Sequence, residues 1–314
     1  MKVLFATDGS KEDQHARSFV ASARWAAGTE IELFGVVDVV NLAVSGDLID
    51  RDLTDFEREL DGFAQRLPLP DCTVTWRTSV GKPAKQIAAR ARAIDADLIV
   101  VGSRGRGPLA TSILGSVSAG VIDRAPCPVL VARQDQVERI MLADDGSAGA
   151  ATAAALLDHW AIFAQASLQI VSVVDVGRPL ATFSDASKIY VAGEHLYYDA
   201  LQEERERAQR TVTARAKGLN PRLSAVGTSV REGDAAEQIL AAAHDFAADL
   251  IVVGSRGLSG LTRLFTGSVA RRVLLDARCS VLVARGSAQL VPEHDRTEQL
   301  GARTPALAGT APIP

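Results

Sequence analysis

The sequence predicts an α/β fold made of two doubly wound domains in tandem, each with a parallel five-stranded sheet. The first observation is a duplication: residues 2–10 are similar to residues 139–147, and residues 96–105 recur letter for letter at 248–257. The second is that short, continuously apolar runs alternate in each copy with charged segments of helical length. Strands that are apolar at every position are typical of a parallel sheet covered by helices on both faces.

The duplication also sets the expected domain boundaries, at residues 1–136 and 137–286. The second copy carries extra residues, which indicate a longer helix at about 183–217. After Arg285 the chain contains Pro, Ala, Gly and Thr without apolar periodicity, so residues 287–314 are expected to be disordered.

In the first copy, five apolar runs are expected to form strands. The first, at 3–6, runs into Asp-Gly-Ser, and Ser10 is expected to cap the helix that follows. Further strands are expected at 31–37, 72–79, 98–101 and 128–132, and helices at 47–66, from Pro83 onward and at 116–124.

The second copy repeats this order. Ser147 is expected to cap its first helix. Its strands are expected at 140–143, 168–174, 224–230, 250–253 and 280–284, with helices from Gly233 onward and at 268–276. In such sheets ligands bind beyond the carboxyl ends of the strands where the strand order reverses, so functional residues should follow strands one and four.

The composition excludes several classes of protein. The chain has 314 residues, a formal net charge of −4, 47% hydrophobic and 23% charged residues, which is enough apolar material for real cores. Its Lys and Arg are scattered among Asp and Glu, so no nucleic-acid-binding face is expected. No apolar run approaches the roughly 20 residues that span a bilayer. With three cysteines and no signal-peptide pattern after Met1, we expect a cytoplasmic protein.

The residues best suited to hold a ligand are glycines around the fourth strand and the last helix. They are Gly102, Gly105 and Gly115 with Ser116, and at the same spacing Gly254, Gly257 and Gly267 with Ser268. Without a Cβ, the backbone can bring its N–H groups close to an anion. The N-terminus of a helix favours phosphate oxygens, and a serine hydroxyl adds one more donor.

This glycine spacing, an opening strand that ends in Asp-Gly-Ser and a closing Ala-Pro-Cys-Pro-Val-Leu-Val at 125–131 resemble the universal stress protein family. The resemblance is to the tandem form and to the ATP-binding branch. It implies a Rossmann-like fold of the adenine nucleotide alpha hydrolase-like type. It also implies that the fifth strands of the two halves pair around a pseudo-twofold axis, and that two such chains can form a homodimer.

The resemblance further implies an adenine nucleotide, ATP with Mg²⁺ as its companion ion, and a role for each matching residue. Asp8 and Asp145 would hold the ribose hydroxyls. Ala6 and Ala143 would lie beside the nucleotide, and the adenine would meet the backbone of Val36 and Val173. The nucleoside would be lined by Val101, Gly102, Val253 and Gly254. The phosphates would contact Gly105, Gly115, Ser116, Val117, Gly257, Gly267, Ser268 and Val269.

Simpler explanations exist for some of these residues. Any strand-to-helix turn tolerates glycine, and an Asp after a strand also caps a turn without a ligand. Asp144 stands where the first copy has Thr7, and we expect its carboxylate near the phosphates to weaken the second site. Arg104 and Arg256 are expected to be solvated, and Cys127 and Cys279 to be small buried hydrophobes. The five histidines lack metal-like spacing.

We expect a nucleotide-dependent sensor or regulator of the stress response, read by a protein partner, rather than an enzyme. No lysine follows Gly115 or Gly267 as in a Walker A loop, and neither a dinucleotide fingerprint nor a nucleophile elbow is present. A phosphorelay receiver is excluded, because no acceptor Asp follows strand three and no lysine follows strand five. Two alternatives stay open: a slow ATPase or autophosphorylating protein, and an interaction module without nucleotide.

Overall fold

A computed structural model gives the structure of residues 1–10, 13–38, 46–103, 114–175, 186–219, 223–255 and 267–286. Residues 287–314, expected to be disordered, lie outside the described residues. Among the helices that the structure describes, none combines the length and apolar character that crossing a membrane requires.

The first half of the chain alternates strands and helices as the sequence predicts. Its elements are β1 (Lys2–Thr7), α1 (Gln14–Ser22), β2 (Glu30–Val37), α2 (Gly46–Arg66), β3 (Thr73–Val80), α3 (Pro83–Ala93), β4 (Leu98–Gly102), α4 (Ser116–Arg124) and β5 (Val129–Ala132). Pro83 takes the first helical position of α3, where its missing N–H costs no hydrogen bond.

The second half repeats this order with one helix enlarged. Its elements are β6 (Arg139–Ala143), α5 (Ala148–His159), β7 (Ser167–Val174), α7 (Ala186–Gly218), β8 (Ala225–Glu232), α8 (Ala235–Asp245), β9 (Leu250–Gly254), α9 (Ser268–Asp276) and β10 (Ser280–Ala284). The short 3-10 helix η3 (Ala161–Phe163), which no sequence pattern predicts, follows α5. The expected long helix is α7, with 33 residues against 21 in α2.

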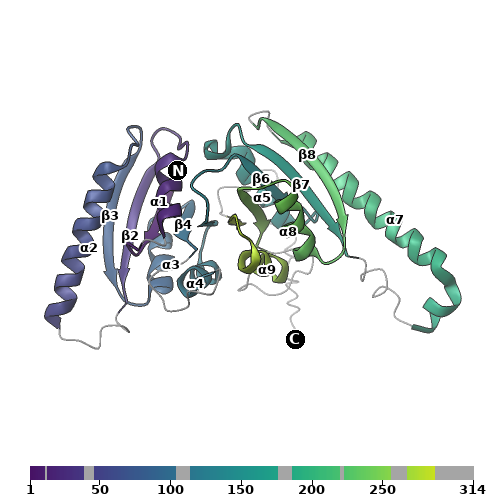
Figure 1. The fold of residues 1–314 in the computed structure, drawn as a ribbon, viewed down its shortest axis with the longest axis horizontal. Helices are drawn as coiled ribbons and strands as arrows, with labels where there is room; N and C mark the ends of the chain where they lie inside the picture. The colour runs from purple at the N-terminus through teal and green to yellow at the C-terminus, as the bar shows by residue number, and fades with distance from the viewer. Residues whose placement is uncertain are drawn as a thin grey trace, which may run out of the picture.

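The ten strands within the described residues form one sheet, in the order β3-β2-β1-β4-β5-β10-β9-β6-β7-β8. Within each half the strands are parallel and follow the order three-two-one-four-five. The halves meet where β5 and β10 pair antiparallel, with Leu130 opposite Leu282. The expected pairing of the fifth strands is therefore found, and Figure 1 shows the two halves on either side of this seam, with α2 and α7 on the outside.

Helices cover both faces of the sheet, and the core consists of one apolar layer on each face. One layer packs β-strand residues such as Leu4 and Val101 against α3, α4, α8 and α9. The other packs Phe5 and Val100 against α1, α2, α5 and α7. Each layer contains residues of both halves, so the two domains share their core. Cys127 and Cys279 are 2% and 8% exposed, as expected of small buried hydrophobes.

The two serine caps have different outcomes. Ser147 does cap α5, because its hydroxyl accepts a hydrogen bond from Ala150 N at 3.2 Å. Ser10 does not cap α1, so this prediction was wrong. The helix begins only at Gln14, with Asp13 as its N-cap residue, which leaves Ser10 too far from the first turn.

Candidate functional site

In the first half, the candidate residues meet at the carboxyl end of the sheet, where the strand order reverses. β1 lies between β2 and β4, and Ala6 is the direct neighbour of Val101. Both residues belong to the apolar layer on the α3 and α4 face, and Val36 at the end of β2 packs against it. These side chains therefore form one apolar wall beside the ends of the central strands, which is where ligands bind in doubly wound sheets.

The second half places the matching residues in the same way. β6 pairs with β9 in parallel, from Ile140 beside Leu250 onward. Val253 is buried in the apolar layer of the α8 and α9 face, and Ala143 and Val173 pack against it. The two walls therefore lie on the same face of the continuous sheet.

The glycine segments after β4 and β9 are closed at their bases by backbone hydrogen bonds. Gly115 donates its N–H to the carbonyl of Ser103 at 2.7 Å, and Gly267 donates to Ser255 at 2.8 Å. Each bond holds the start of the last helix against the end of the fourth strand. Gly105 and Gly257 lie within these segments but outside the described residues, so their predicted phosphate contacts stay predictions.

The last helix of each half begins without a side-chain cap. Gly115 precedes α4 with φ −70° and ψ 153°, and Gly267 precedes α9 with φ −56° and ψ 154°. Since the N-cap residue of each helix is glycine, it offers no side chain to cap the first turn. Ser116 and Ser268 are exposed there. The first N–H groups of a helix have no intrahelical partner, so each start can donate to an anion.

Two exposed valines stand beside these helix starts. Val117 is 39% exposed and Val269 is 36% exposed, at equivalent positions in the second residue of α4 and of α9. Each follows a serine whose hydroxyl is a further donor. The start of each last helix therefore offers polar donors and apolar surface together.

Glycine at position 254 also has a packing reason. A Cβ there would come within 2.6 Å of the backbone of Gly149 in α5. The close approach of α5 to the end of β9 therefore requires glycine, whether or not a ligand is present. This packing reason differs from the turn explanation that the sequence allowed for the glycines.

Asp8 and Asp145 each organise the turn after the first strand of their half. Oδ1 of Asp8 accepts the N–H of Ser10 at 2.9 Å, and Oδ1 of Asp145 accepts that of Ser147 at 3.0 Å. The glycine between them takes a left-handed conformation in both halves, with φ +71° at Gly9. This is the turn-capping role that Asp commonly has. A ribose contact by either residue is compatible with it and stays a prediction.

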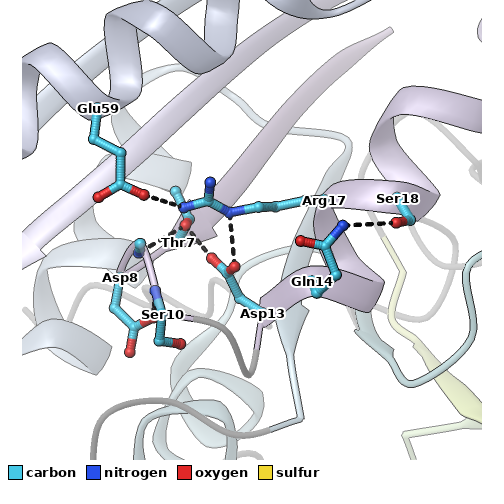
Figure 2. A network of polar contacts seen from close by, with 9 residues as sticks. Thr7, Asp8, Ser10, Asp13, Gln14, Arg17, Ser18 and Glu59 are labelled. Atoms are coloured by element: carbon cyan, nitrogen blue, oxygen red, sulfur yellow. Dashed lines mark hydrogen bonds and ion pairs between the residues drawn. The ribbon is translucent and has the colours of Figure 1, made fainter.

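A buried polar network supports the turn in the first half from behind. Figure 2 shows the Asp8 side chain turned away from this network. Thr7 Oγ1 donates to Asp13 and accepts the N–H of Gly9 at 3.1 Å. Arg17 bridges the other side of Asp13 at 2.7 Å and Glu59 of α2 at 2.8 Å. Burial raises the pKa of the Asp13 carboxyl, against the lowering effects of its hydrogen bond from Thr7 and of the Arg17 charge.

In the second half, the corresponding turn is supported by Asp144 and its ion pair with Arg215. Oδ1 of Asp144 accepts the N–H of Gly146 at 2.9 Å, and its Oδ2 accepts a hydrogen bond from Nε of Arg215 at 2.7 Å. The preceding Ala143 faces the candidate site, so strand alternation turns Asp144 toward the other face, where α7 lies. The Asp144 side chain is 0% exposed. The expectation that this carboxylate lies near the phosphates was therefore wrong.

The supporting residues Arg17, Glu59 and Arg215 were not identified from the sequence. Glu59 and Arg215 come from helices far along the chain from the turns that they support, whereas Arg17 lies in α1, four residues after its partner Asp13. Nothing in the local sequence of those turns identifies these residues as partners. The orientation of Asp144 could have been predicted from β6, because successive side chains of a strand point to opposite faces of the sheet. No group of His, Cys, Asp and Glu suited to a metal ion occurs among the residues that the structure describes.

Comparison with known proteins assigns the family. The family model described as universal stress protein family matches the chain twice, at residues 1–133 and 136–285. A universal stress protein of Mycobacterium tuberculosis strain H37Rv is 34% identical over 203 residues, 62% of this chain. That match spans 63% of the length of the mycobacterial relative. A universal stress protein of Thermus aquaticus is 38% identical over 148 residues, 46% of this chain and 97% of its own length.

A solved structure agrees in fold over most of the chain. The crystal structure of a universal stress protein from Archaeoglobus fulgidus superposes with a TM-score of 0.65 at 22% identity. The match covers 90% of this chain and 98% of that one. At this level of identity the similarity concerns the arrangement of strands and helices alone.

Proposed function

The chain belongs to the universal stress protein family, and on this premise we propose that each of its two domains binds one adenine nucleotide, ATP with Mg²⁺. We further propose that nucleotide occupancy is the state that a protein partner senses, and that the chain binds ATP without catalytic turnover. The three cysteines are free thiols, which suits the reducing cytoplasm in which we place the protein.

One observation carries the proposal: in each half a helix start with glycine as its N-cap residue is held beside an apolar wall at the reversal point of the sheet. The hydrogen bond from Gly115 to Ser103 fixes the start of α4 next to the end of β4. Ala6 and Val101 lie at the same sheet edge. Unpartnered N–H groups and the positive end of the helix dipole favour phosphate oxygens, while the apolar wall favours a base.

The roles within each site follow from this arrangement. The base would lie against the wall at Val36 or Val173, and Asp8 or Asp145 would reach the ribose with the carboxylate that also holds the turn. The phosphates would lie at the helix start, with Ser116 or Ser268 as hydroxyl donors. Since a helix start and a glycine segment together offer donors to more than one phosphate, a nucleotide with at least two phosphates is favoured over AMP.

The regulatory step is proposed to be a change of surface rather than a reaction. A ligand that binds one arrangement of the glycine segment and the last helix more tightly shifts the chain toward that arrangement. A partner that contacts this surface then distinguishes the occupied from the empty chain. The ATPase alternative differs in one measurable respect, which is the release of ADP.

The test is calorimetric titration with Mg-ATP of the full chain and of two variants, Gly115→Val and Gly267→Val. Both glycines have extended φ and ψ values that a β-branched residue adopts readily, so the substitution blocks the helix start without backbone strain. Two sites per chain are expected, with one lost in each variant. Gly218→Val, at the end of α7 with no atom close to the added Cβ, is the matched control.

The outcomes separate the three functions. Two sites, their selective loss and unchanged ATP after prolonged incubation support a binding sensor. Stoichiometric binding with steady ADP release, measured by anion-exchange chromatography, contradicts the proposal in favour of the ATPase. Absence of binding in the full chain contradicts it in favour of an interaction module without nucleotide.

A further inference from the structure

Two arginines cross the seam between the domains and hold the far ends of the last helices. Arg133 follows β5 and Arg285 follows β10, at equivalent positions of the two copies. Nη2 of Arg133 donates to the carbonyl of Leu274 in α9 at 2.7 Å, and its Nη1 donates to that of Cys279 at 3.2 Å. The residue is only 7% exposed. An arginine of the first domain therefore binds the C-terminal end of the last helix of the second domain.

The reciprocal contact is made by Arg285. Its Nη2 donates to the carbonyl of Ile122 in α4, and its Nη1 donates to that of Ala125 at 3.2 Å. Ile122 and Leu274 are equivalent residues in the two copies. The pseudo-twofold relation of the strands thus extends to this exchange of arginines. Each domain supplies the cation that holds the last helix of the other.

These contacts are suited to fixing a helix along its axis. The last carbonyl groups of a helix have no intrahelical partner, and a cation there is stabilised by the helix dipole. Hydrogen bonds from a charged donor in a buried place are stronger than neutral ones. Each guanidinium donates to two carbonyls at once, which also fixes the direction of the helix end.

α4 is a helix of nine residues, so its two ends belong to one short rigid body. One end is the candidate phosphate site of the first domain, and the other is held by Arg285 of the second domain. The same description applies to α9 and Arg133. We propose that Arg285 is a positioning residue for the nucleotide site of the first domain, and Arg133 for that of the second. This inference rests on the nucleotide binding proposed above.

A chain of contacts also leads from Arg285 to the second site. Arg285 directly follows Ala284, whose carbonyl accepts the N–H of Ser255 at 2.9 Å. Ser255 in turn accepts the N–H of Gly267, which begins α9. This path runs through main-chain atoms alone, so it does not depend on the Arg285 side chain.

The test combines each arginine substitution with each of the two glycine substitutions, so that every chain retains one unblocked nucleotide site. Gly267→Val leaves the first site open, and Gly115→Val leaves the second. Arg285→Gln is added to each, and Arg133→Gln is added to each. We expect Arg285→Gln to weaken Mg-ATP binding at the first site about fivefold or more, and Arg133→Gln to weaken the second by a similar factor. Each substitution should change the other site less than about twofold, within the scatter of independent positions.

This readout distinguishes a positioning role from a general effect on folding. Substitution of either arginine is expected to lower the thermal midpoint of unfolding by a similar amount. The losses of affinity, in contrast, should each appear in the domain that does not contain the substituted arginine. Arg285→Lys and Arg133→Lys keep the charge without the fork of donors, and should give intermediate losses at the same sites. They also keep the test valid where a glutamine variant fails to fold.

Two results would contradict the positioning role of the arginines, and both can be distinguished from a failure of nucleotide binding itself. Equal losses at both sites, or unchanged affinity at both, overturn the positioning role while nucleotide binding stands. Absence of Mg-ATP binding in the unsubstituted chain overturns the proposed function, and the positioning role with it.

Discussion

Nε of Arg215 lies 2.7 Å from Oδ2 of Asp144, and this ion pair joins α7 to the turn after β6. The carboxylate is fully buried and the guanidinium is 25% exposed. In the first half Thr7, Asp13 and Arg17 occupy the corresponding region, so the two copies stabilise the same turn with different charges. The enlarged helix of the second copy thus supplies the partner that its Asp144 requires.

Removal of the Arg215 charge should destabilise the second domain. Arg215→Gln leaves a buried carboxylate without its cation, which is expected to cost about 2–3 kcal/mol, somewhat below the range for a fully buried pair. Urea unfolding measures this change. Arg210→Gln is the matched control on α7, because Arg210 forms an exposed pair with Glu206 and its substitution should cost less than about 0.5 kcal/mol. Equal effects of the two substitutions would contradict the buried ion pair.

Neutralising Asp144 should not improve nucleotide binding at the second site. Its carboxylate points to the sheet face opposite Ala143 and is paired with Arg215. Asp144→Asn is therefore expected to leave the Mg-ATP affinity of the Gly115→Val chain within about twofold, since a charge that Arg215 already compensates on the far face adds little. A tenfold gain in affinity would restore the original expectation that this carboxylate repels phosphate.

The Asp13 carboxyl gives the first domain a pH dependence of known sign. Burial raises its pKa above the ordinary value of 3.8 in the folded chain. The folded state therefore retains this proton more tightly than the unfolded state, and the contribution to stability is full below 3.8 and is lost as pH rises through the raised pKa.

Asp13→Asn isolates this effect, because asparagine resembles the protonated side chain. The difference in unfolding free energy, wild type minus variant, is expected to decrease as pH is raised from 3.8 through the raised pKa of Asp13. Urea midpoints at several pH values in that range measure it. A difference that grows with pH would mean that the ion pair with Arg17 outweighs the cost of burial.

The two strand-five thiols should be inert in the folded chain. Burial raises the pKa of Cys127 to about 12 and that of Cys279 to about 11. At pH 8 fewer than about one in a thousand of either thiol is ionised, and the thiolate is the reactive form. Ellman's reagent is expected to label the less buried Cys72 first, and the other two only after unfolding. Rapid labelling of Cys279 in the folded chain would favour a redox role instead.

The seam should be as important to stability as the interior of either half. Leu282 is 0% exposed and lies opposite Leu130. Leu282→Ala is expected to cost about 2–5 kcal/mol and to lower a single unfolding transition, because the halves share their core layers. Leu275→Ala in α9 is the control, with a side chain in a residue that is 41% exposed and an expected cost within about 0.5 kcal/mol. Two separated calorimetric transitions would show that the halves unfold independently.

Much of the fold was predictable because local signals agree with the global arrangement. The last helix at 116–124, opened by Gly-Ser and closed before Pro, has the same bounds in the structure, as does α9. The start of α1 was misassigned to Ser10, because a serine in a turn and a serine at a helix start look alike in sequence. Ser147 shows that the same motif does cap a helix when the helix begins directly after it.

The parts of the site that escaped prediction depend on distant side chains. Arg215 reaches Asp144 from 71 residues away, and Arg285 reaches Ala125 from 160 residues away. Such contacts follow from packing, which no local pattern encodes. The arginine at the end of each copy, after Val-Leu-Val-Ala, was a repeated signal that the sequence contained but whose target only the antiparallel seam reveals.

The presence of two adenine-nucleotide sites in the chain can be tested by counting the nucleotide that the purified protein carries. The protein is purified without added nucleotide and denatured, and the supernatant is quantified by ion-exchange chromatography, with Gly115→Val and Gly267→Val in parallel. ATP near two per chain is expected, reduced to about one in either variant. Chain that carries no nucleotide and shows no thermal shift with Mg-ATP would contradict it and leave the fold as that of an interaction module.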